Sequence, residues 1–207
     1  MAALTATDAE TFERCMAVEG VAVFPADTVY GLACEPESKE GARRLYALKR
    51  RRPDQPAAVL FFQPSLALAA LPELGPRTRD ALLALLPGPV TLLVPNPAAR
   101  YPLACGPESS VLGLRVPALP PELAALGAVR WPVLQSSANL SGRPEARRLA
   151  DVDPGIRAGA DLLLDGGELP GVASTIVDLT AYEDAGVWTV VREGALATSA
   201  IAARLAT

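Results

Sequence analysis

The sequence contains no histidine in its 207 residues. This absence excludes a Ser-His-Asp triad, a Cys-His pair and a metal site with histidine ligands, because each of these needs an imidazole. If the chain is an enzyme, its chemistry must rest on cations, hydroxyls, amides and carboxylates, together with any hard cation that the substrate brings.

Cysteine is also scarce. Cys15, Cys34 and Cys105 are odd in number, widely spaced and without a CxxC pair. This pattern favours free thiols in a reducing compartment, so we expect a cytoplasmic protein. The first 15 residues lack the basic and apolar segments of a signal peptide. The longest apolar stretch, residues 81–95, is interrupted by Pro-Gly-Pro, so we expect no membrane span.

Positive charge is slightly under-represented, with 19 Lys and Arg against 23 Asp and Glu and a net charge of −4. This balance argues against nucleic-acid binding driven by overall charge, although a local basic surface stays open. Half of the residues are apolar and 20% are charged, which is typical of a globular chain with a real core. There is no internal repeat and no break in composition. We therefore expect a single domain over residues 1–207.

Apolar runs between Gly and Pro residues predict strands, and apolar residues at helical spacing predict helices. Both alternate at first and strands dominate later, which predicts an α/β fold with a mixed sheet. A capping box at Thr7 and Glu10 is expected to begin the first helix, and Ser38 to cap the second. The expected strands are 21–24, 57–62, 90–94, 112–116, 132–135, 162–164, 175–179 and 187–191, and the expected helices are 7–18, 38–48, 78–86, 122–126 and 198–205.

A run of four cations, Lys49, Arg50, Arg51 and Arg52, follows the second expected helix. Cations at a helix C-terminus oppose the helix dipole and contribute about 0.3–1 kcal/mol each. Four adjacent cations exceed what capping needs and repel one another, and a polyphosphate would compensate them well. If the helix stops between Lys49 and Arg51, these two side chains can converge. A solvated helix end, a nucleic-acid patch and a phosphate clamp all stay open.

Two polar loops directly follow expected strands. SSANLSG, residues 136–142, suits a loop whose backbone N–H groups face an anion, and it equally suits a turn with a local Ser or Asn cap. ADTVYGLA, residues 26–33, groups Asp27, Thr28 and Tyr30, where either a small polar ligand binds or the strand simply ends in a turn. Neither GxxxxGK[ST] nor GxGxxG occurs, so the sequence has no P-loop and no dinucleotide-binding fingerprint.

The order and spacing of several segments resemble one family. The segments are PADTVYGLACEP, the K-x-R of Lys49 and Arg51, PGPVTLLVP, LGLRVP, SSANLSG, STIVDLT and VVREGAL, within residues 8–200. Together they resemble the YrdC-like threonylcarbamoyl-AMP synthases in their short, single-domain form. The K-x-R followed far downstream by S-x-N (Ser137 and Asn139) is the specific part of this resemblance. It implies one α/β domain with a twisted, mixed parallel and antiparallel sheet flanked by helices.

The resemblance implies that L-threonine, bicarbonate or carbon dioxide, and ATP give threonylcarbamoyl-AMP and pyrophosphate, with Mg²⁺ accompanying the ATP. A tRNA threonylcarbamoyl transferase complex would use the product to make N6-threonylcarbamoyladenosine. This chemistry agrees with the missing histidines. The carbamate is already an anionic nucleophile, and cations can stabilise the leaving pyrophosphate.

The resemblance also implies roles for individual residues. Lys49 and Arg51 would face the ATP phosphates and be the catalytic residues. Arg50 and Arg52 have no implied role, and RNA contact through residues 49–52 stays open. No protein metal ligand is implied. The remaining residues would bind ATP (Gln55, Ser137, Asn139 and Arg192) or threonine (Thr28, Arg115 and Ser174).

Some positions depart from the family's pattern. Ala26 and Ala173 replace a usual Thr and Glu, and Val111 stands where a hydroxyl residue is usual. Glu145 would bring negative charge near the phosphates if it points inward. Two alternatives therefore stay open: an RNA-binding module on the same fold, and a paralogue that uses a different carbamoyl substrate.

Overall fold

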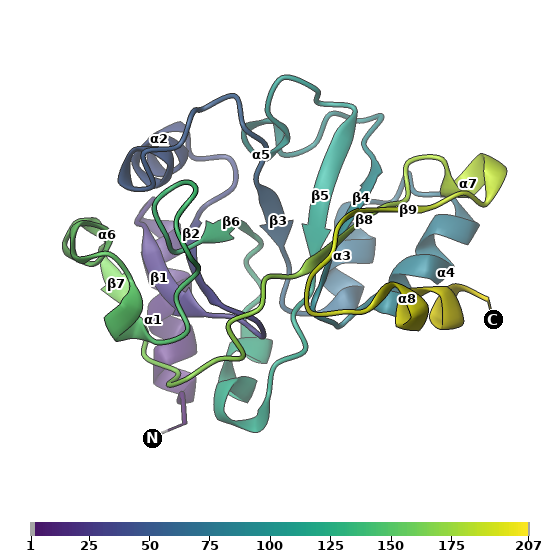
Figure 1. Ribbon diagram of the computed structural model, residues 1–207. Helices are drawn as coiled ribbons and strands as arrows, with labels where there is room; N and C mark the ends of the chain where they lie inside the picture. The colour runs from purple at the N-terminus through teal and green to yellow at the C-terminus, as the bar shows by residue number, and fades with distance from the viewer. Residues whose placement is uncertain (1–2, 207) are drawn as a thin grey trace.

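The computed structural model describes residues 3–206, and within this range the strands form one mixed nine-stranded sheet (Figure 1). The strand order is β7-β1-β2-β6-β3-β5-β4-β8-β9. The pairs β1/β7, β3/β5 and β4/β8 are parallel and the other pairs are antiparallel. The predicted α/β class with a mixed sheet is confirmed. The strands are β1 (Ala22–Pro25), β2 (Tyr30–Cys34), β3 (Ala58–Leu60), β4 (Val90–Pro95), β5 (Val111–Arg115), β6 (Val133–Ser137), β7 (Leu162–Leu163), β8 (Thr175–Asp178) and β9 (Thr189–Arg192).

Helices flank the sheet. The first helix and the longer 3-10 segment lie side by side at the bottom of the view in Figure 1, and they enclose a smaller core of their own. The other helices of the first half pack on the main core. The helices are α1 (Ala6–Ala17), α2 (Lys39–Leu48), α3 (Pro64–Ala70), α4 (Pro76–Leu85), α5 (Pro102–Cys105), α6 (Pro154–Gly159), α7 (Tyr182–Ala185) and α8 (Thr198–Leu205), and the 3-10 segments are η1 (Pro121–Ala128) and η2 (Leu149–Asp151).

The capping box of α1 lies two residues earlier than predicted. Thr5 is the N-cap: its hydroxyl accepts from the Asp8 N–H at 3.3 Å, and the Asp8 carboxylate accepts from the Thr5 N–H at 2.7 Å. Thr5 and Asp8 have the same spacing as Thr7 and Glu10, so the spacing alone does not choose between the two pairs. The predicted cap of α2 is confirmed, since the Ser38 hydroxyl accepts from the Gly41 N–H.

Strand β2 is buried along its whole length, although the sequence predicted only a loop with an apolar run there. A glycine inside a strand weakens its sequence signal. Here Gly31 allows close packing, because a Cβ at this position would lie 2.9 Å from Gln135 Nε2 and 2.9 Å from a ring carbon of Phe24. Strand β2 therefore fits tightly between β1 and β6, its two neighbours in the sheet.

The smaller core is built around aromatic rings. Phe12 of α1 lies 5.2 Å from Phe24 of β1 and 5.7 Å from Phe62 after β3, measured between ring centroids. These are favourable aromatic separations, and all three side chains are buried. This cluster packs on one face of the sheet, next to Leu60 and Val133, and the main core covers the other face.

No helix within residues 3–206 is long and apolar enough to cross a lipid bilayer. The three cysteines are buried free thiols. Burial raises the pKa of Cys15 to about 11 and that of Cys34 to about 12, so both remain protonated and unreactive at neutral pH.

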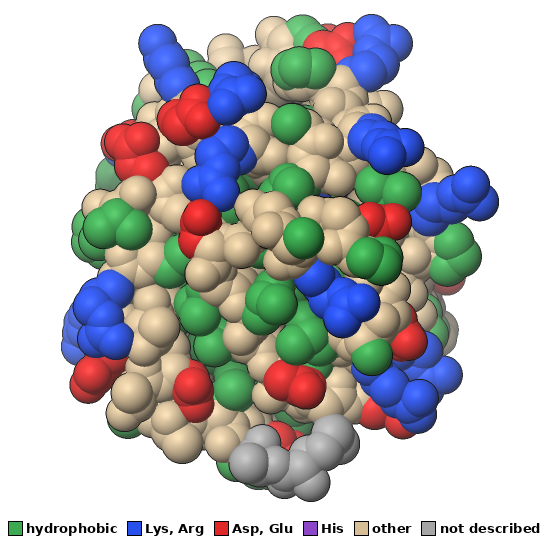
Figure 2. All heavy atoms as spheres, turned by 90° about the vertical axis from the view of Figure 1, so that its left-hand side faces the viewer, with side chains coloured by type: hydrophobic (Ala, Val, Ile, Leu, Met, Phe, Trp, Pro, Cys, Tyr) green, Lys and Arg blue, Asp and Glu red, His purple; other side chains and the backbone are tan. Residues whose placement is uncertain are grey.

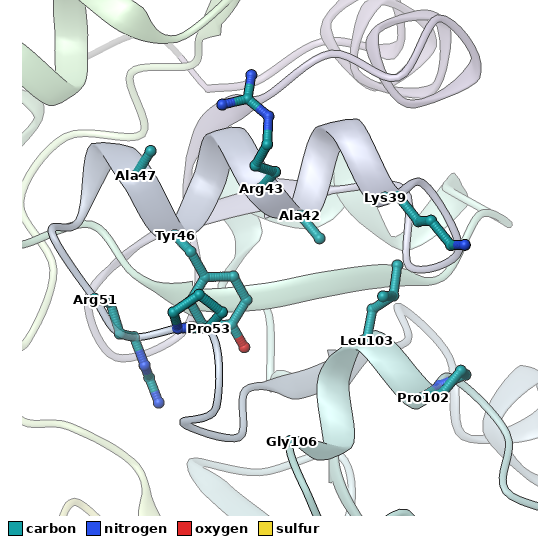
Figure 3. A pocket seen from close by; sticks show the side chains of 10 residues that line it. All are labelled: Lys39, Ala42, Arg43, Tyr46, Ala47, Arg51, Pro53, Pro102, Leu103 and Gly106. Atoms are coloured by element: carbon teal, nitrogen blue, oxygen red, sulfur yellow. The ribbon is translucent and has the colours of Figure 1, made fainter.

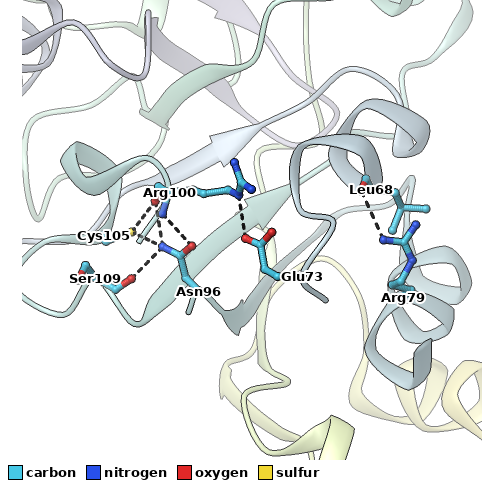
Figure 4. A network of polar contacts seen from close by, with 7 residues as sticks. All are labelled: Leu68, Glu73, Arg79, Asn96, Arg100, Cys105 and Ser109. Carbon is cyan, nitrogen blue, oxygen red and sulfur yellow. Dashed lines mark hydrogen bonds and ion pairs between the residues drawn. The ribbon is translucent and has the colours of Figure 1, made fainter. Parts of the chain in front are cut away.

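The loop between β4 and β5 is held by one buried amide, that of Asn96 (Figure 4). The Asn96 Nδ2 donates to the carbonyls of Arg100 at 2.9 Å and Ser109 at 2.8 Å, and its Oδ1 accepts from the Arg100 N–H at 3.0 Å. The side chain of Arg100 turns outward to Glu73, at 2.8 Å. Asn96 thus closes a loop that includes α5, which lies beside the candidate site.

We expect Asn96→Ala to lower the free energy of unfolding by roughly 2 kcal/mol, because it leaves backbone groups of Arg100 and Ser109 without partners. Urea denaturation measures this loss. The control Arg100→Ala removes a partly exposed ion pair and should cost less than about 1 kcal/mol. Equal losses in the two variants would contradict the assignment of Asn96 as the anchor of the loop.

Candidate active site

The basic run divides where α2 ends. The helix stops at Leu48, Lys49 is its C-cap, and Arg50 has a left-handed backbone with φ of 50°. This turn sends Lys49 and Arg51 toward the loop after β6, as the sequence suggested for a helix that stops between them. Arg50 is exposed, and Arg52 is exposed and paired with Asp54.

Lys49 is only 2% exposed, and its ammonium group lies under the loop after β6. Its Nζ donates to the carbonyl of Ser137, to the carbonyl of Asn139 at 2.8 Å and to Asn139 Oδ1 at 3.2 Å. The Lys49 carbonyl in turn accepts from the Ser141 N–H at 2.9 Å. An ammonium has three hydrogens to donate and here it has three acceptors, so Lys49 holds the S-x-N loop in place.

Burial, reinforced by the nearby charge of Arg51, lowers the pKa of Lys49 to about 7, and Glu145 opposes this shift. An ammonium group taken out of water loses hydration, which favours its neutral form. The site therefore contains a cation whose charge depends on its surroundings near neutral pH.

Asn139 also contributes to the shape of this loop. Its Oδ1 accepts from the Ser137 hydroxyl at 2.5 Å, and its Nδ2 donates to the carbonyl of Arg143. The S-x-N pair is thus joined internally, and Ser137 is the member that borders the main cavity.

Arg51 stands between two cavities and lines both. Its guanidinium donates to the Ser136 hydroxyl at 2.8 Å and to the carbonyl of Pro56, and it lies 5.8 Å from the centroid of the Tyr46 ring. Its Nε is buried without a hydrogen-bond partner among the described residues. Arg51 is held firmly and keeps donor capacity for a ligand.

The main cavity has a volume of about 520 Å³ and lies on one face of the sheet. Alternate residues of a strand point to the same face, and the lining follows this rule in β4, β5 and β8, whereas β6 contributes Ser136 in addition to Gln135 and Ser137. Three guanidinium groups and three carboxylates meet there. The floor of the cavity is formed by Thr91 and Leu93 of β4, by Val111, Gly113 and Arg115 of β5, by Gln135 and Ser137 of β6, and by Ser174, Ile176 and Asp178 in and just before β8. The charged residues of the lining are Arg51, Arg115, Arg192, Glu108, Glu145 and Asp178.

The side of the cavity near β8 is arranged by hydroxyl groups. Ser174 Oγ lies 2.8 Å from Thr91 Oγ1, and the Ser174 carbonyl accepts from Arg192 Nη2 at 2.6 Å. Sequence reasoning named Ser174 and Arg192 and missed Thr91. The position of Thr91 in an apolar strand gave no polar signal, and only its place on the cavity face reveals it.

Arg115, the last residue of β5, is paired with Asp27, which the sequence grouped with Thr28 and Tyr30 but to which the family resemblance assigned no role. Its Nη2 donates to Asp27 Oδ1 at 2.7 Å, and both side chains are 4% exposed. The same Nη2 lies 3.3 Å from the hydroxyl of Thr28, which is also buried. Arg115 borders the cavity, and Asp27 and Thr28 lie behind it.

Gln55 is not brought to either cavity. It is exposed, and its contact with the site region is through its carbonyl, which accepts from the Tyr46 hydroxyl at 2.8 Å. Its role in nucleotide binding stays a prediction. Glu145, by contrast, does line the cavity. Its negative charge therefore lies at the candidate site.

The second cavity, of about 440 Å³, lies between α2 and α5 (Figure 3). Figure 3 shows the Tyr46 ring and Pro53 between Arg51 on one side and Leu103 on the other. Its lining is mostly apolar, and it contains none of the residues predicted to bind a ligand except Arg51. The main cavity is therefore the candidate active site.

The face of the molecule in Figure 2 shows Lys and Arg side chains in separate groups, several of them beside Asp or Glu. Ion pairs on the described surface agree with this, such as Arg43 with Glu40 and Arg44 with Asp161. RNA contact through residues 49–52 stays a prediction, and of those cations only Arg50 and Arg52 are exposed.

Residues 14–194 match the family model Sua5/YciO/YrdC, which is described as telomere recombination. The chain belongs to the Sua5/YciO/YrdC family. A threonylcarbamoyl-AMP synthase of Xanthomonas campestris pv. campestris is 32% identical over 191 residues, covering 90% of this chain and 97% of the relative. A threonylcarbamoyl-AMP synthase of Hahella chejuensis is 30% identical over 174 residues, covering 84% and 91%. These relatives are enzymes, and the resemblance noted from the motifs is confirmed.

Solved structures confirm the Sua5/YciO/YrdC fold. The P. abyssi Sua5 complexed with L-threonine superposes with a TM-score of 0.81 at 23% identity, covering 97% of this chain and 58% of that one. E. coli YciO superposes with a TM-score of 0.76 at 22% identity, covering 97% and 95%. The chain thus matches YciO over nearly its whole length and Sua5 over little more than half.

The pKa of Lys49 has a measurable consequence for stability. A folded-state pKa of about 7 lies below the ordinary value of 10.5, so between these pH values the unfolded chain binds more protons than the folded chain. Relative to Lys49→Met, the wild type should therefore gain stability as pH rises from about 7 to 10, by at most about 1.4 kcal/mol per pH unit.

Urea denaturation of both proteins across this pH range measures the difference. Glu145→Gln should move the window to lower pH, because Glu145 raises the pKa of Lys49. A difference between wild type and Lys49→Met that stays constant with pH would show that the ammonium is not shifted by burial.

Proposed function

We propose that this chain is a threonylcarbamoyl-AMP synthase, a nucleotidyltransferase that uses L-threonine, bicarbonate or carbon dioxide, and ATP. The observation that carries this proposal is the composition of the main cavity. Arg51 and Ser137, from the K-x-R and S-x-N segments, line the same cavity as Arg115, Ser174 and Arg192. The family membership and the named activity of its relatives support the same function.

The reaction requires charge stabilisation and alignment. The neutral amine of threonine takes up carbon dioxide and releases one proton to water, which gives a carbamate. An oxygen of this carbamate then attacks the α-phosphorus of ATP. The bond from that phosphorus to the bridging oxygen of the β-phosphate breaks, and pyrophosphate leaves with the electron pair. A carbamate needs no general base, so a chain without histidine can hold both reactants in line and stabilise the charge that develops.

Different groups that line the cavity suit the phosphates and the amino acid. We assign the phosphates to Arg51, Ser137 and Arg192, because guanidinium groups bind phosphate oxygens in pairs and Arg51 has an unpaired donor. We assign the threonine carboxylate to Arg115 and the threonine side chain to Ser174. Here Thr28 acts through Arg115, since it lies behind the cavity wall.

Lys49, Asn139 and Gln55 have less direct roles in this proposal. Lys49 and Asn139 hold the loop that presents Ser137 to the phosphates, and Lys49 adds positive charge from beneath it. A contact of Gln55 with the nucleotide requires that its exposed side chain turn toward the cavity. Lys49 and Arg51 remain the proposed catalytic pair.

Mg²⁺ would enter with ATP. Among the described residues there is no group of three or more Cys, Asp or Glu that could hold a metal ion by itself. Hard cations bind phosphate oxygens and keep several waters, so the nucleotide supplies most of the ligands. The bound ion would stabilise charge on the pyrophosphate. We further propose that the protein acts in the cytoplasm and supplies a tRNA threonylcarbamoyl transferase complex.

Pyrophosphate release tests the function directly. Purified protein with ATP and Mg²⁺ should release pyrophosphate only when both L-threonine and bicarbonate are present, and EDTA should abolish the release. Release without threonine dependence would contradict the proposal. Release that depends on bicarbonate and a different amino acid would favour the paralogue with another carbamoyl substrate.

Arg51 and Arg50 form a matched pair for mutation. Arg51→Gln should reduce pyrophosphate release at least about 100-fold, since it removes a charge that faces the phosphates. Arg50→Gln should change it less than about twofold, because Arg50 is exposed and does not line the cavity. A similar loss in both variants would mean that the cationic run acts as a whole.

A further inference from the structure

The turn after β1 contains a buried carboxylate whose two oxygens are both bound. Asp27 Oδ1 accepts from Arg115 Nη2 at 2.7 Å, and Oδ2 accepts from the Ala118 N–H at 3.0 Å. Three strands, β2, β6 and β3, separate β1 from β5 in the sheet. Asp27 thus ties two distant segments together on the side of the cavity.

Arg115 is held at one nitrogen and keeps donors at the others. Its Nη2 is taken by Asp27 and Thr28, while its Nε is buried and has no partner. Within residues 3–206, no hydrogen bond is found for Nη1 either. A buried guanidinium with unpaired donors at a cavity wall is suited to an incoming oxyanion.

Burying the Asp27–Arg115 ion pair costs desolvation free energy, and a contribution to stability does not by itself account for this cost. Burial raises the pKa of Asp27 and lowers that of Arg115, and their mutual attraction opposes both shifts. Well-packed apolar residues often replace such buried pairs without loss of stability. A pair that served only stability would have its donors satisfied, whereas this one leaves donors of Arg115 free beside the cavity.

We propose that Asp27 is a positioning residue that fixes the guanidinium of Arg115 so that its free N–H donors receive the carboxylate of the amino-acid substrate. This inference rests on the proposed function for the identity of the substrate. Because Asp27 balances the charge of Arg115, the site selects a carboxylate by the fixed direction of N–H donors rather than by net charge. The guanidinium is ordered before the substrate binds, which reduces the entropy lost on binding.

A pair of ligands tests this selection. Calorimetric titration without ATP compares L-threonine with L-threoninamide, which lacks the carboxylate and offers a single acceptor oxygen in its place. The wild type should bind L-threonine at least about tenfold more tightly than the amide. Asp27→Asn and Asp27→Glu should both reduce this preference to about threefold or less.

The two variants separate positioning from charge balance. Asp27→Asn keeps the shape and removes the charge, whereas Asp27→Glu keeps the charge and displaces it by one methylene. Circular dichroism and thermal melting check that each variant folds. Asp27→Glu decides between the two roles, and an Asp27→Asn variant that keeps the full preference overturns both. If Asp27→Glu keeps the full preference for threonine, Asp27 serves charge balance only and the inference is overturned.

Asp161→Asn is the matched control, since Asp161 pairs with Arg44 at 2.8 Å on the surface away from the cavity. It should keep the wild-type preference, and a loss there as large as in Asp27→Asn would overturn the inference. A wild type with no preference for threonine over the amide would also overturn it. Preference that depends on Asp27 without threonine-dependent pyrophosphate release would support the positioning role and refute the synthase activity.

Discussion

The ammonium group of Lys49 connects the end of α2 to the loop after β6, and the arrangement of the active site depends on this contact. Two segments almost ninety residues apart meet because one buried cation binds the carbonyls of Ser137 and Asn139. The left-handed backbone at Arg50 makes the contact possible, since it turns the chain as soon as the helix has ended. The same turn brings Arg51 to Ser136. The two cations therefore both bind the chain at the end of β6 and in the loop that follows it.

The rest of the site combines guanidinium groups and carboxylates on one face of the sheet. Arg51, Arg115 and Arg192 border a cavity that carboxylates also border. An anionic substrate entering such a cavity meets fixed donors in a region of reduced dielectric, where each hydrogen bond is stronger than in water. Glu145 adds a further carboxylate to the lining of this cavity.

Much of the fold follows from local patterns in the sequence. The closing helix over residues 198–205 and the cap at Ser38 are where the pattern put them. Short elements without a full period of apolar residues, such as α5 and α7, were not predicted. Strand β2 was missed because Gly31 weakens its signal, and its place between β1 and β6 becomes evident only from packing.

The sequence by itself determined the chemistry that the site uses. The lack of histidine, the K-x-R and S-x-N segments and the arginines after later strands all indicated binding of anions without imidazole. Only the tertiary structure decided which groups face the cavity and which support them from behind. Lys49 looked equivalent to Arg51 in the sequence, yet it lies under the loop, and Asp27 had no assigned role until it was found against Arg115. The reason is physical: residue type sets which interactions a side chain can make, but burial and the partners brought together by distant strands set which of them it does make.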